Sequence, residues 1–421
     1  MKSRPLMRLD VAPGSAGALA VADALVDALA GTGPAIAPIP VAPRAHAERI
    51  VRAVRPDDSS APLESDAVAL CVATAGSVGQ PRGVLLTSEQ LIASAQMSDH
   101  SLGDPARWLL ALPVDHIAGI QVLVRSHLSG LPPVIMESLG GGGRFTPEEF
   151  ANAARAARAM CDADGAQLRT ALVPTQLIRV LDAGRDGVNA LGAFDAVLVG
   201  GATTPSSVIE RAHSRGIKLI TTYGMTESAG GCVYDGHPLP GVSVTIGDAD
   251  SHGLGRIELK GPNIALGYRL RPADTAESFV DGKFLTNDVG RLKAGLLHVR
   301  GRRDDVVQVG GMNVSLPAID DCLSRQPGVS QAASVAQPDD QWGSRITSFV
   351  VLRQPVSEED AGDLERLRRK LTQSVAKQLG TEARPRSVVL VPSLPTLPSG
   401  KIDRSALSLL AAQPTTNRPQ V

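Results

Sequence analysis

The sequence has little cysteine and no surplus of charge of either sign, and each absence argues against a class of protein. Its four cysteines, Cys71, Cys161, Cys232 and Cys322, are far apart and form no CxxC pair. This spacing argues against a disulfide framework and a structural zinc site, and we expect a reducing, cytoplasmic compartment. Because the formal net charge is only -1, we expect neither a nucleic-acid partner nor an anionic membrane partner.

Long hydrophobic runs are also missing. No stretch of about 18 uncharged apolar residues is strong enough to predict a membrane span. Basic residues precede an Ala-rich stretch near the N-terminus, as they would in a signal peptide. However, Asp10, Asp23 and Asp27 interrupt any apolar core, so the pattern favours an amphipathic helix instead.

What is present is an ordinary globular composition, with 43% apolar and 20% charged residues in a chain of 421. This length predicts two domains. In the first half, helical patterns alternate with short apolar runs, which predicts an α/β sheet with helices on its faces. The predicted helices cover about 15–31 and 148–163, and the predicted strands cover 67–73, 109–112, 133–135, 171–173, 195–199 and 218–222. Residues Gly33 to Pro43 are interpreted as a Pro-rich connector.

The pattern changes twice in the second half. After about residue 240, short strands separated by Gly and Asp turns indicate a β-rich subdomain. A charged segment, Gly301 to Asp305, then precedes a small α+β domain with helices at 317–324 and 361–378 and strands at 332–336, 346–352 and 387–391. We therefore predict an α/β protein with a large N-terminal domain, residues 1–301, and a small C-terminal domain, residues 302–421.

The first motif with chemical meaning runs from Thr74 to Gly83 and directly follows a predicted strand. It places three glycines and two hydroxyls in a short turn, whose exposed backbone N–H groups can surround phosphate oxygens. Arg82 adds a fixed positive charge. The spacing is not that of a Walker A loop, and taken alone the motif is equally typical of an ordinary turn.

Two further residues lie beside apolar segments. His116 stands close to Gly119 at the end of a predicted strand and can enter a pocket, although a hydrogen-bonded core histidine is the more common interpretation. Arg125 lies within the apolar stretch that follows. A guanidinium there is either a carboxylate anchor or a helix residue that reaches solvent, and without context the second is favoured.

Two loop segments follow predicted parallel strands, where the carboxyl ends of a sheet bring ligand-binding loops together. They are Gly200-Gly201-Ala202 and the run from Tyr223 to Glu227. Tyr223 offers a flat face to a purine, Thr226 a hydroxyl to a phosphate, and Glu227 a hard oxygen to Mg²⁺. In isolation these are ordinary loop residues.

The last motifs lie in the second half of the chain. Asp288, in a turn, can accept hydrogen bonds from ribose hydroxyls, and Gly301 to Asp305 has the character of a charged linker. Lys401 stands on a loop shaped by proline and glycine, from Leu394 to Arg404. Most lysines in such positions are simply solvated surface residues.

Taken together and in this order, the motifs resemble the acyl-adenylate-forming (AMP-binding) superfamily, which includes acyl-CoA synthetases, adenylation domains of peptide synthetases and luciferases. The resemblance covers about Ala67 to Arg404. It implies α/β subdomains plus a β-rich part in the large domain, and a mobile small domain. It also implies an enzyme that uses ATP and Mg²⁺ to join a carboxylic acid to AMP, and then passes the acyl group to coenzyme A.

The resemblance assigns roles to the matching positions in both halves of the chain. For the nucleotide, it implies phosphate binding by Thr74, Ser77, Gly79 and Arg82, adenine binding by Gly201, Ala202 and Tyr223, α-phosphate binding by Thr226, Mg²⁺ binding by Glu227, and ribose binding by Asp288 and Arg302. For catalysis, Lys401 bridges the carboxylate and the α-phosphate, Asp304 is the hinge, and Gly310 and Gly311 face the pantetheine tunnel. The family usually has TSGTTGxPKG in the phosphate loop, so Ala75, Val78 and Arg82 depart from it.

A narrower resemblance concerns the acid. The segment Tyr223–Gly236, the His116-x-x-Gly119 pattern with Arg125 after it, and the short N-terminal region are similar to o-succinylbenzoate–CoA ligases of actinobacterial type, which act in menaquinone biosynthesis. The similarity implies an acid pocket formed by His116, Arg125, Ser228 and Gly230, in which Arg125 and Ser228 hold the ring carboxylate.

Several interpretations stay open at this stage. The acid can be another aryl or acyl carboxylate, and a carrier protein can replace coenzyme A as acceptor. An aromatic content of only 3% argues against a luciferase-type oxidative enzyme, and the departures in the phosphate loop keep a non-catalytic nucleotide-binding module in view. The expected partners are therefore small molecules, and a homodimer is considered as the assembly.

Overall fold

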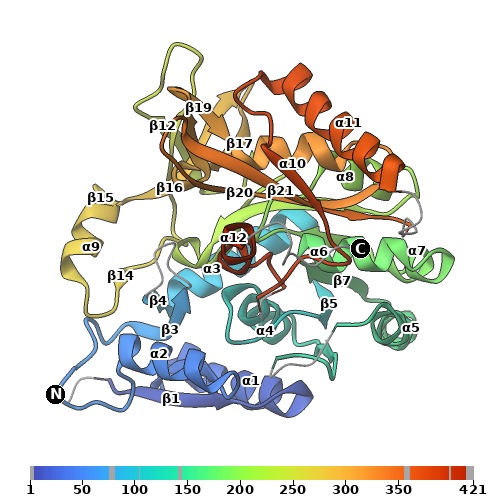
Figure 1. The fold of residues 1–421 in the computed structure, drawn as a ribbon. Coiled ribbons are helices and arrows are strands. Elements are labelled where there is room, and N and C mark those ends of the chain that lie inside the picture. Colours follow the sequence, from blue (N-terminus) through green and yellow to red (C-terminus); the bar gives the residue numbers. More distant parts are fainter. Residues whose placement is uncertain are drawn as a thin grey trace. The chain divides into compact units, whose positions relative to one another are not determined.

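The computed structural model describes residues 4–74, 81–103, 105–140, 145–354, 361–397 and 400–413 (Figure 1). The chain forms two compact units. The first consists of Met1–Ala202, Ala212–Thr286 and Leu292–His298, and the second of Thr203–Arg211, Asn287–Arg291 and Val299–Val421. The main division, between His298 and Val299, falls close to the domain boundary that the sequence suggests at 301/302.

The first unit begins with a five-stranded sheet in the order β1-β2-β3-β4-β14. Its strands are β1 (Leu6–Val11), β2 (Ala35–Pro40), β3 (Val68–Thr74), β4 (Arg82–Thr87) and β14 (Gly267–Tyr268), and its helices are α1 (Gly14–Ala30) and α2 (Arg44–Val54). The first three strands are parallel, whereas β4 is antiparallel to both β3 and β14. The buried strand predicted at 67–73 is thus β3, which leads through the phosphate-loop motif into β4.

A seven-stranded sheet follows, in the order β11-β10-β9-β8-β7-β5-β6. Its strands are β5 (Ala106–Leu110), β6 (Val134–Ile135), β7 (Gln167–Leu172), β8 (Ala196–Val199), β9 (Leu219–Met225), β10 (Gly230–Tyr234) and β11 (His237–Pro238). The strands from β5 to β9 are parallel and all five residues of β5 are buried, as expected where helices cover both faces. The predicted α/β class is confirmed.

Local sequence signals explain where the helices of this sheet begin. They are α3 (Ser88–Leu102), α4 (Ile117–Ser129), α5 (Pro147–Asp164), α6 (Pro174–Asp182), α7 (Arg185–Gly192) and α8 (Ser206–His213). Thr87 and Gln90 form a capping box at the start of α3. Thr146 caps α5 ahead of a proline in its first turn, and Gly165 ends that helix in the left-handed conformation.

The predicted β-rich part is a twisted set of strands that ends the first unit. It contains β12 (Ser243–Gly247), β13 (Gly255–Lys260), β15 (Phe279–Val280), β16 (Lys283–Lys293) and β17 (Leu296–Arg302), with the short helices η1 (Thr226–Ser228) and α9 (Pro272–Ser278) nearby in the chain. Its core includes Val244, Ile257, Leu259 and Phe284. The chain passes from the first unit into the second along β16 and β17.

The second unit contains a hairpin and a three-stranded sheet in the order β20-β21-β22. Its elements are η2 (Arg303–Asp305), β18 (Val306–Val309), β19 (Met312–Ser315), α10 (Leu316–Ser324), β20 (Val329–Asp339), β21 (Gly343–Leu352), α11 (Ala361–Leu379), β22 (Ser387–Leu390) and α12 (Arg404–Ala412). Two clusters of apolar side chains form its core, around Leu323 and around Phe349. The helices and strands predicted here from the sequence are all present.

The prediction of a connector between Gly33 and Pro43 is wrong, because this segment contains the fully buried strand β2. Residues 36, 38 and 40 of β2 direct their backbone groups away from β1, since Ala35 donates its N–H to Pro5 on the β1 side. The backbone of Pro38 and Pro40 therefore faces the β3 side, where pairing with β3 ends at Ile36. The N–H that each proline lacks is not needed there for a hydrogen bond between strands. Two prolines that normally argue against a strand are tolerated for this reason.

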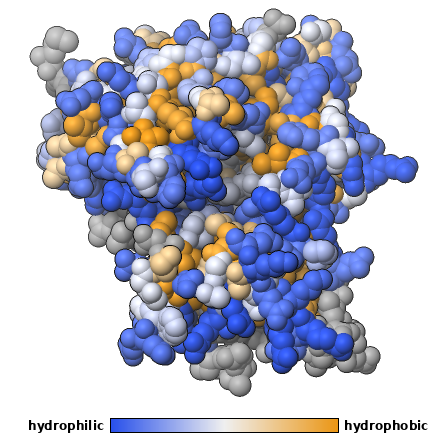
Figure 2. Space-filling view, turned by 90° about the horizontal axis from the view of Figure 1, so that it is seen from above, coloured by the Kyte–Doolittle hydropathy of each residue, from blue (hydrophilic) through white to orange (hydrophobic). Residues whose placement is uncertain are grey.

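In the part of the chain that the structure describes, no helix combines the length and the apolar character needed to cross a membrane. The face seen in Figure 2 is mainly hydrophilic, and its hydrophobic side chains are divided into separate patches. All four cysteines are buried and form no disulfide.

Candidate active site

The two loop segments predicted to bind adenine and phosphate leave neighbouring parallel strands. Strand β8 pairs with β9 in a register that sets Val199 opposite Thr221, so Gly200–Ala202 and Tyr223–Glu227 leave the same edge of the sheet side by side. Gly201 has a φ of +79°, which favours glycine. At Gly200 a Cβ atom would lie 2.1 Å from the Thr222 hydroxyl oxygen, so only glycine allows this close approach.

The turn that carries Thr226 and Glu227 is held by hydrogen bonds from its own residues. The Ser228 hydroxyl accepts from the Met225 N–H at 3.0 Å and lies 2.8 Å from the Gly230 carbonyl, to which it donates. The Met225 carbonyl lies 3.1 Å from the same hydroxyl and is a second acceptor for its proton. Ser228, which is fully buried, thus shapes the turn, and its contact with the acid stays a prediction.

Glu227 is buried, and its carboxylate is held by a residue that the motifs did not indicate. The Tyr268 hydroxyl donates to Oε1 of Glu227 at 2.9 Å. Burial, together with the adjacent carboxylate, raises the pKa of Tyr268, so the phenol stays protonated and remains a donor. No other hydrogen bond to this carboxylate occurs among the described residues, and Oε2 keeps its lone pairs for a cation.

This geometry fits the Mg²⁺ ion that the resemblance implies. Within the described residues, no three His, Cys, Asp or Glu side chains gather into a group that could hold a metal ion. Mg²⁺ is commonly bound by one or two carboxylates together with nucleotide phosphates, rather than by a cage made only of protein. A single oriented carboxylate at Glu227 matches that mode.

The phosphate-loop motif joins two antiparallel strands. Thr74 ends β3, Arg82 begins β4, and the two residues pair directly across the hairpin. Ser77 and Gly79 lie outside the described residues. The Arg82 guanidinium lies over the ring of Tyr268, with its carbon 4.6 Å from the ring centroid. Arg82 thus contacts the same tyrosine that holds Glu227.

The predicted acid pocket adjoins helices α3 and α4. Gly230 follows the turn with a φ of +106°, and a Cβ atom there would lie 3.3 Å from Cγ of Gln121 and 4.0 Å from the Ser94 hydroxyl oxygen. Ser94 donates to the Ala229 carbonyl at 2.8 Å, which holds α3 against the turn. Gln121 is buried, and its Oε1 has no hydrogen-bond partner among the described residues.

Arg125 lies one helical turn after Gln121, on the same face of α4. Only 4% of the residue is exposed, so the interpretation as a solvent-reaching side chain is wrong. Its guanidinium carbon lies 5.0 Å from the centroid of the buried Trp108 ring. Among the described residues Arg125 makes no ion pair or hydrogen bond, and its Nε is buried without a partner.

Asp99, whose charge interacts with that of Arg125, is paired with a different arginine. Asp99 lies 3.5 Å from Arg169, which is completely buried and also donates to the Gln167 side chain and the Leu102 carbonyl. Burial raises the pKa of Asp99, while the charges of Arg125 and Arg169 oppose that shift. Asp99 therefore acts on Arg125 through its charge rather than through a hydrogen bond.

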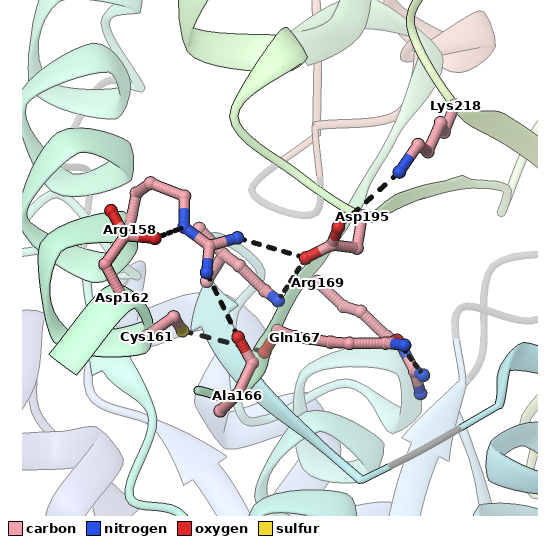
Figure 3. A network of polar contacts seen from close by, with 9 residues as sticks. Arg158, Cys161, Asp162, Ala166, Gln167, Arg169, Asp195 and Lys218 are labelled. Atoms are coloured by element: carbon pink, nitrogen blue, oxygen red, sulfur yellow. Dashed lines mark hydrogen bonds and ion pairs between the residues drawn. The ribbon is translucent and has the colours of Figure 1, made fainter. Parts of the chain in front are cut away.

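Figure 3 shows the polar network around the start of β7, to which Arg169 and Gln167 belong. Arg158 reaches from α5 to Asp195 at 3.0 Å, and Lys218 lies 3.5 Å from the other oxygen of that carboxylate. Arg158 also donates to the Ala166 carbonyl at 3.1 Å. These contacts join α5 to the strands of the sheet and are structural.

His116 is the N-cap residue of α4, at the opposite end of the helix from Arg125. Its side chain is 34% exposed, so the interpretation as a core histidine is wrong. Its Nε2 lies 3.9 Å from the Asp115 carboxylate. The helix that carries Gln121 and Arg125 therefore starts at a partly accessible imidazole.

The remaining predicted site residues belong to the second unit. Asp288 lies on β16, Arg302 ends β17, and Asp304 lies within the short helix η2. Lys401 is exposed on a tight loop in which Thr396 and Ile402 form an isolated bridge and the Leu397 N–H donates to the Lys401 carbonyl at 2.8 Å. The loop thus presents this lysine on a constrained backbone.

The second unit also contains a cavity of about 800 Å³ that no motif indicated. Among its lining residues are five arginines, Arg345, Arg368, Arg369, Arg384 and Arg386. Trp342 also lines it and accepts a hydrogen bond from the Gly310 N–H at 2.9 Å through its carbonyl. The arginines come from β21, α11 and the segment before β22, and only the fold brings them together.

Comparison with known proteins connects these features. The family model of AMP-binding enzymes matches residues 21–269, and the model of their C-terminal domain matches residues 318–401. A protein of Mycobacterium tuberculosis named "probable 2-succinylbenzoate–CoA ligase" is 36% identical over 410 residues, which are 95% of this chain and 97% of that protein. A 2-succinylbenzoate–CoA ligase of Listeria monocytogenes is 30% identical and covers 79% of this chain and 68% of its own length.

The solved structures extend the similarity to the fold. The o-succinylbenzoate CoA synthetase from Bacillus subtilis, in complex with its acyl-adenylate intermediate, matches with a TM-score of 0.70 at 23% identity. The match covers 96% of this chain and 88% of that one. At this identity, the likeness concerns the arrangement of the two domains' elements rather than the choice of substrate.

Proposed function

The chain belongs to the family of AMP-binding enzymes, and we propose that it joins o-succinylbenzoate (2-succinylbenzoate) to coenzyme A at the expense of ATP. The names of the similar ligases and the motifs after β9 support this acid. The observation that carries the proposal is Arg125, a buried guanidinium with no hydrogen-bond acceptor among the described residues.

A buried charge without a partner is costly. Removing an ion from water costs several kcal/mol even after the protein relaxes. The ring of Trp108 offsets only part of this cost, since cation–π contacts contribute about 0.5–2 kcal/mol. o-Succinylbenzoate has two carboxylates, of which only the aliphatic one reacts. Asp99 acts on Arg125 through its charge but makes no hydrogen bond to it, and the ring carboxylate provides that missing acceptor.

The small residues of the turn let it approach helix α4 closely. Ala229 has a φ of +49°, and a Cβ atom on Gly230, which follows it, would lie only 3.3 Å from Cγ of Gln121, so this position favours glycine. His116, at the start of the same helix, lies on the accessible side. We propose that this surface, rather than a long apolar tunnel, receives the acid, so that aromatic dicarboxylates are preferred over fatty acids.

The reaction has two steps. In the first, an oxygen of the aliphatic carboxylate attacks the α-phosphorus of ATP, the bond to the β-phosphate oxygen breaks, and pyrophosphate leaves. In the second, the thiol of coenzyme A loses its proton to water, its sulfur attacks the acyl carbon, the bond from that carbon to the AMP oxygen breaks, and AMP leaves. Mg²⁺, when bound, neutralises phosphate charge. Glu227 would hold the ion, Thr226 would contact the α-phosphate, and Lys401 would offset the repulsion between the two anions in the first step.

The cavity of the second unit suits the phosphates of coenzyme A, which carries a diphosphate and a 3′-phosphate. Five arginines line it, and planar guanidinium groups bind phosphate oxygens in pairs. Trp342 offers an aromatic face to the adenine. Gly310, predicted to face the pantetheine arm, is hydrogen-bonded to Trp342, so both ends of coenzyme A have neighbouring partners in this unit. ATP and coenzyme A are available in the cytoplasm, and we place the enzyme there. A homodimer stays a prediction.

A screen of acids tests the function. Pyrophosphate release is measured with o-succinylbenzoate, benzoate and a fatty acid, each with and without coenzyme A, and with a phosphopantetheinylated carrier protein as the competing acceptor. We expect release only with o-succinylbenzoate and formation of a thioester with coenzyme A. Equal activity with benzoate would contradict the proposed acid, and transfer to the carrier alone would make the protein a stand-alone adenylation enzyme.

A further inference from the structure

One aromatic residue joins two parts of the nucleotide site that are far apart in the sequence. Tyr268 donates its hydroxyl proton to Glu227 at 2.9 Å, while its ring lies under the guanidinium of Arg82 at 4.6 Å. Only 3% of Tyr268 is exposed. The tyrosine therefore contacts the carboxylate assigned to Mg²⁺ at its polar end and the arginine of the phosphate-loop motif on its face.

The fold gives this tyrosine little freedom. Strand β14 pairs with β4 so that Tyr268 lies opposite Val84, two residues after Arg82. The Tyr268 N–H donates to the Thr275 hydroxyl at 2.9 Å. The next residue, Arg269, is almost completely buried and donates to the carbonyls of Val54 and Pro62 and to Glu64. The backbone of Tyr268 is thus held on both sides.

The other partner is held in the same way. The Ala265 N–H donates to the Glu227 carbonyl at 2.9 Å, so the segment that leads into β14 is also hydrogen-bonded to the turn that carries the carboxylate. A carboxylate fixed at its backbone still rotates about its side-chain bonds. In the described part of the chain, the hydrogen bond from the Tyr268 hydroxyl is the one that restricts this rotation.

Arginine suits the phosphate-loop position in this chain for a reason that the tyrosine supplies. A guanidinium is planar and weakly hydrated and stacks on an aromatic face, whereas the ammonium of the lysine that the family usually has is a compact, strongly hydrated charge. The Nε of Arg82 is buried without a hydrogen-bond partner among the described residues, so the ring is its main contact. The arginine in place of the usual lysine therefore allows the stacking contact with Tyr268.

We propose that Tyr268 is a positioning residue for the adenylation step: its hydroxyl orients Glu227 toward Mg²⁺, and its ring holds Arg82 in place at the end of the phosphate loop. The proposal rests on the AMP-binding function but not on the identity of the acid. A tyrosine with a purely structural role would contribute to folding without affecting metal binding. Loss of a hydrogen bond to a metal-binding carboxylate typically lowers the metal affinity about 10- to 100-fold.

Two variants separate the two contacts. Tyr268→Phe keeps the ring under Arg82 and removes the hydrogen bond to Glu227. Arg82→Lys keeps the positive charge and leaves the Tyr268 hydroxyl in place, but it removes the planar guanidinium that stacks on the tyrosine ring. The matched control is Tyr234→Phe, because Tyr234 is another buried tyrosine of the first unit, and its hydroxyl pairs with Ser98 at 2.8 Å.

The measurements need neither the acid nor coenzyme A. Mn²⁺, as a probe for Mg²⁺, is titrated into the full-length protein with ATP and followed by electron paramagnetic resonance, and ATP binding in EDTA is measured by calorimetry. We expect Tyr268→Phe to weaken Mn²⁺ binding by about 10- to 100-fold and to leave ATP binding in EDTA unchanged. Arg82→Lys should weaken ATP binding in EDTA by about 5- to 30-fold and leave Mn²⁺ binding intact.

Other results overturn the proposal. If Tyr268→Phe binds Mn²⁺ like the unmodified protein, or if Tyr234→Phe is weakened to the same degree, the hydroxyl has no specific role toward the metal. If Arg82→Lys binds ATP normally, the ring has no role in holding the arginine. A failure of the proposed acid in the substrate screen leaves these binding results unaffected, so the two failures are distinguishable.

Discussion

At the scale of single residues, the environment of a charged group indicates what it binds. Arg107 and Arg125 both come from apolar segments and are both buried, yet Arg107 donates to the Pro132 carbonyl at 2.7 Å and pairs with Asp164. Arg125 has no such acceptor among the described residues. The Nε atoms of both arginines are buried without a partner, but only the terminal nitrogens of Arg107 have acceptors among the described residues. This difference is why we propose an anion as the partner of Arg125.

Replacing Arg125 tests this difference. Arg125→Ala should raise KM for o-succinylbenzoate by about 10- to 100-fold, because a hydrogen bond to a charged group is lost, and should leave KM for ATP unchanged. The control substrate is 4-oxo-4-phenylbutanoate, which lacks the ring carboxylate and should be used equally by both proteins. Steady-state pyrophosphate release measures all three values. An unaltered KM for the dicarboxylate would remove Arg125 from the acid site.

At the scale of helices and strands, the sequence predicted elements with a clear period and missed those that depend on their neighbours. Helix α10 and strand β21 follow from their own residues, because the buried residues of α10 repeat at the helix period and β21 contains a short run of consecutive buried residues, mostly apolar. Strand β2 does not, since its two prolines are tolerated only because of where β3 stops pairing. The arginine cavity was missed because its residues come from separate elements, each of which has an ordinary charged surface.

The cavity leads to a prediction about coenzyme A. Arg384→Ala and Arg386→Ala, just before β22, should each raise KM for coenzyme A by about tenfold or more through loss of a charge-assisted phosphate contact. Adenylate formation, measured by pyrophosphate exchange, should not change. Arg325→Ala is the matched control, since Arg325 lies in the same unit, pairs with Asp321 at 2.8 Å and does not line the cavity. Equal effects in all three variants would contradict the assignment.

At the scale of the whole molecule, the division into two units assigns different parts of the chemistry to each. The first unit carries the residues predicted for adenine, phosphate, Mg²⁺ and the acid, and the second carries Lys401, Asp304 and the arginine cavity. A residue in a short linker can absorb the change in φ and ψ that reorients one domain against another. We therefore predict that the two half-reactions depend on different residues of the second unit.

A crossed pair of variants tests that prediction. Lys401→Ala should slow adenylate formation by about 10²- to 10³-fold and spare thioester formation from supplied acyl-AMP, because the lysine offsets charge only in the first step. Asp304→Pro should do the reverse and slow thioester formation by about tenfold or more, because proline restricts the backbone at the hinge. Single-turnover assays of each half-reaction measure both. Parallel losses in both half-reactions would contradict the lysine and hinge roles.

The sequence by itself determined the class of fold, the order of the motifs and the nucleotide chemistry, because these depend on residue type and on periodic patterns along the chain. Only the tertiary structure decided that Arg125 is buried over Trp108, that the Ser228 hydroxyl is used by its own turn, and that Tyr268 joins Arg82 to Glu227. The physical reason is that burial and hydrogen-bond satisfaction depend on residues distant in the chain, so a local pattern leaves them open.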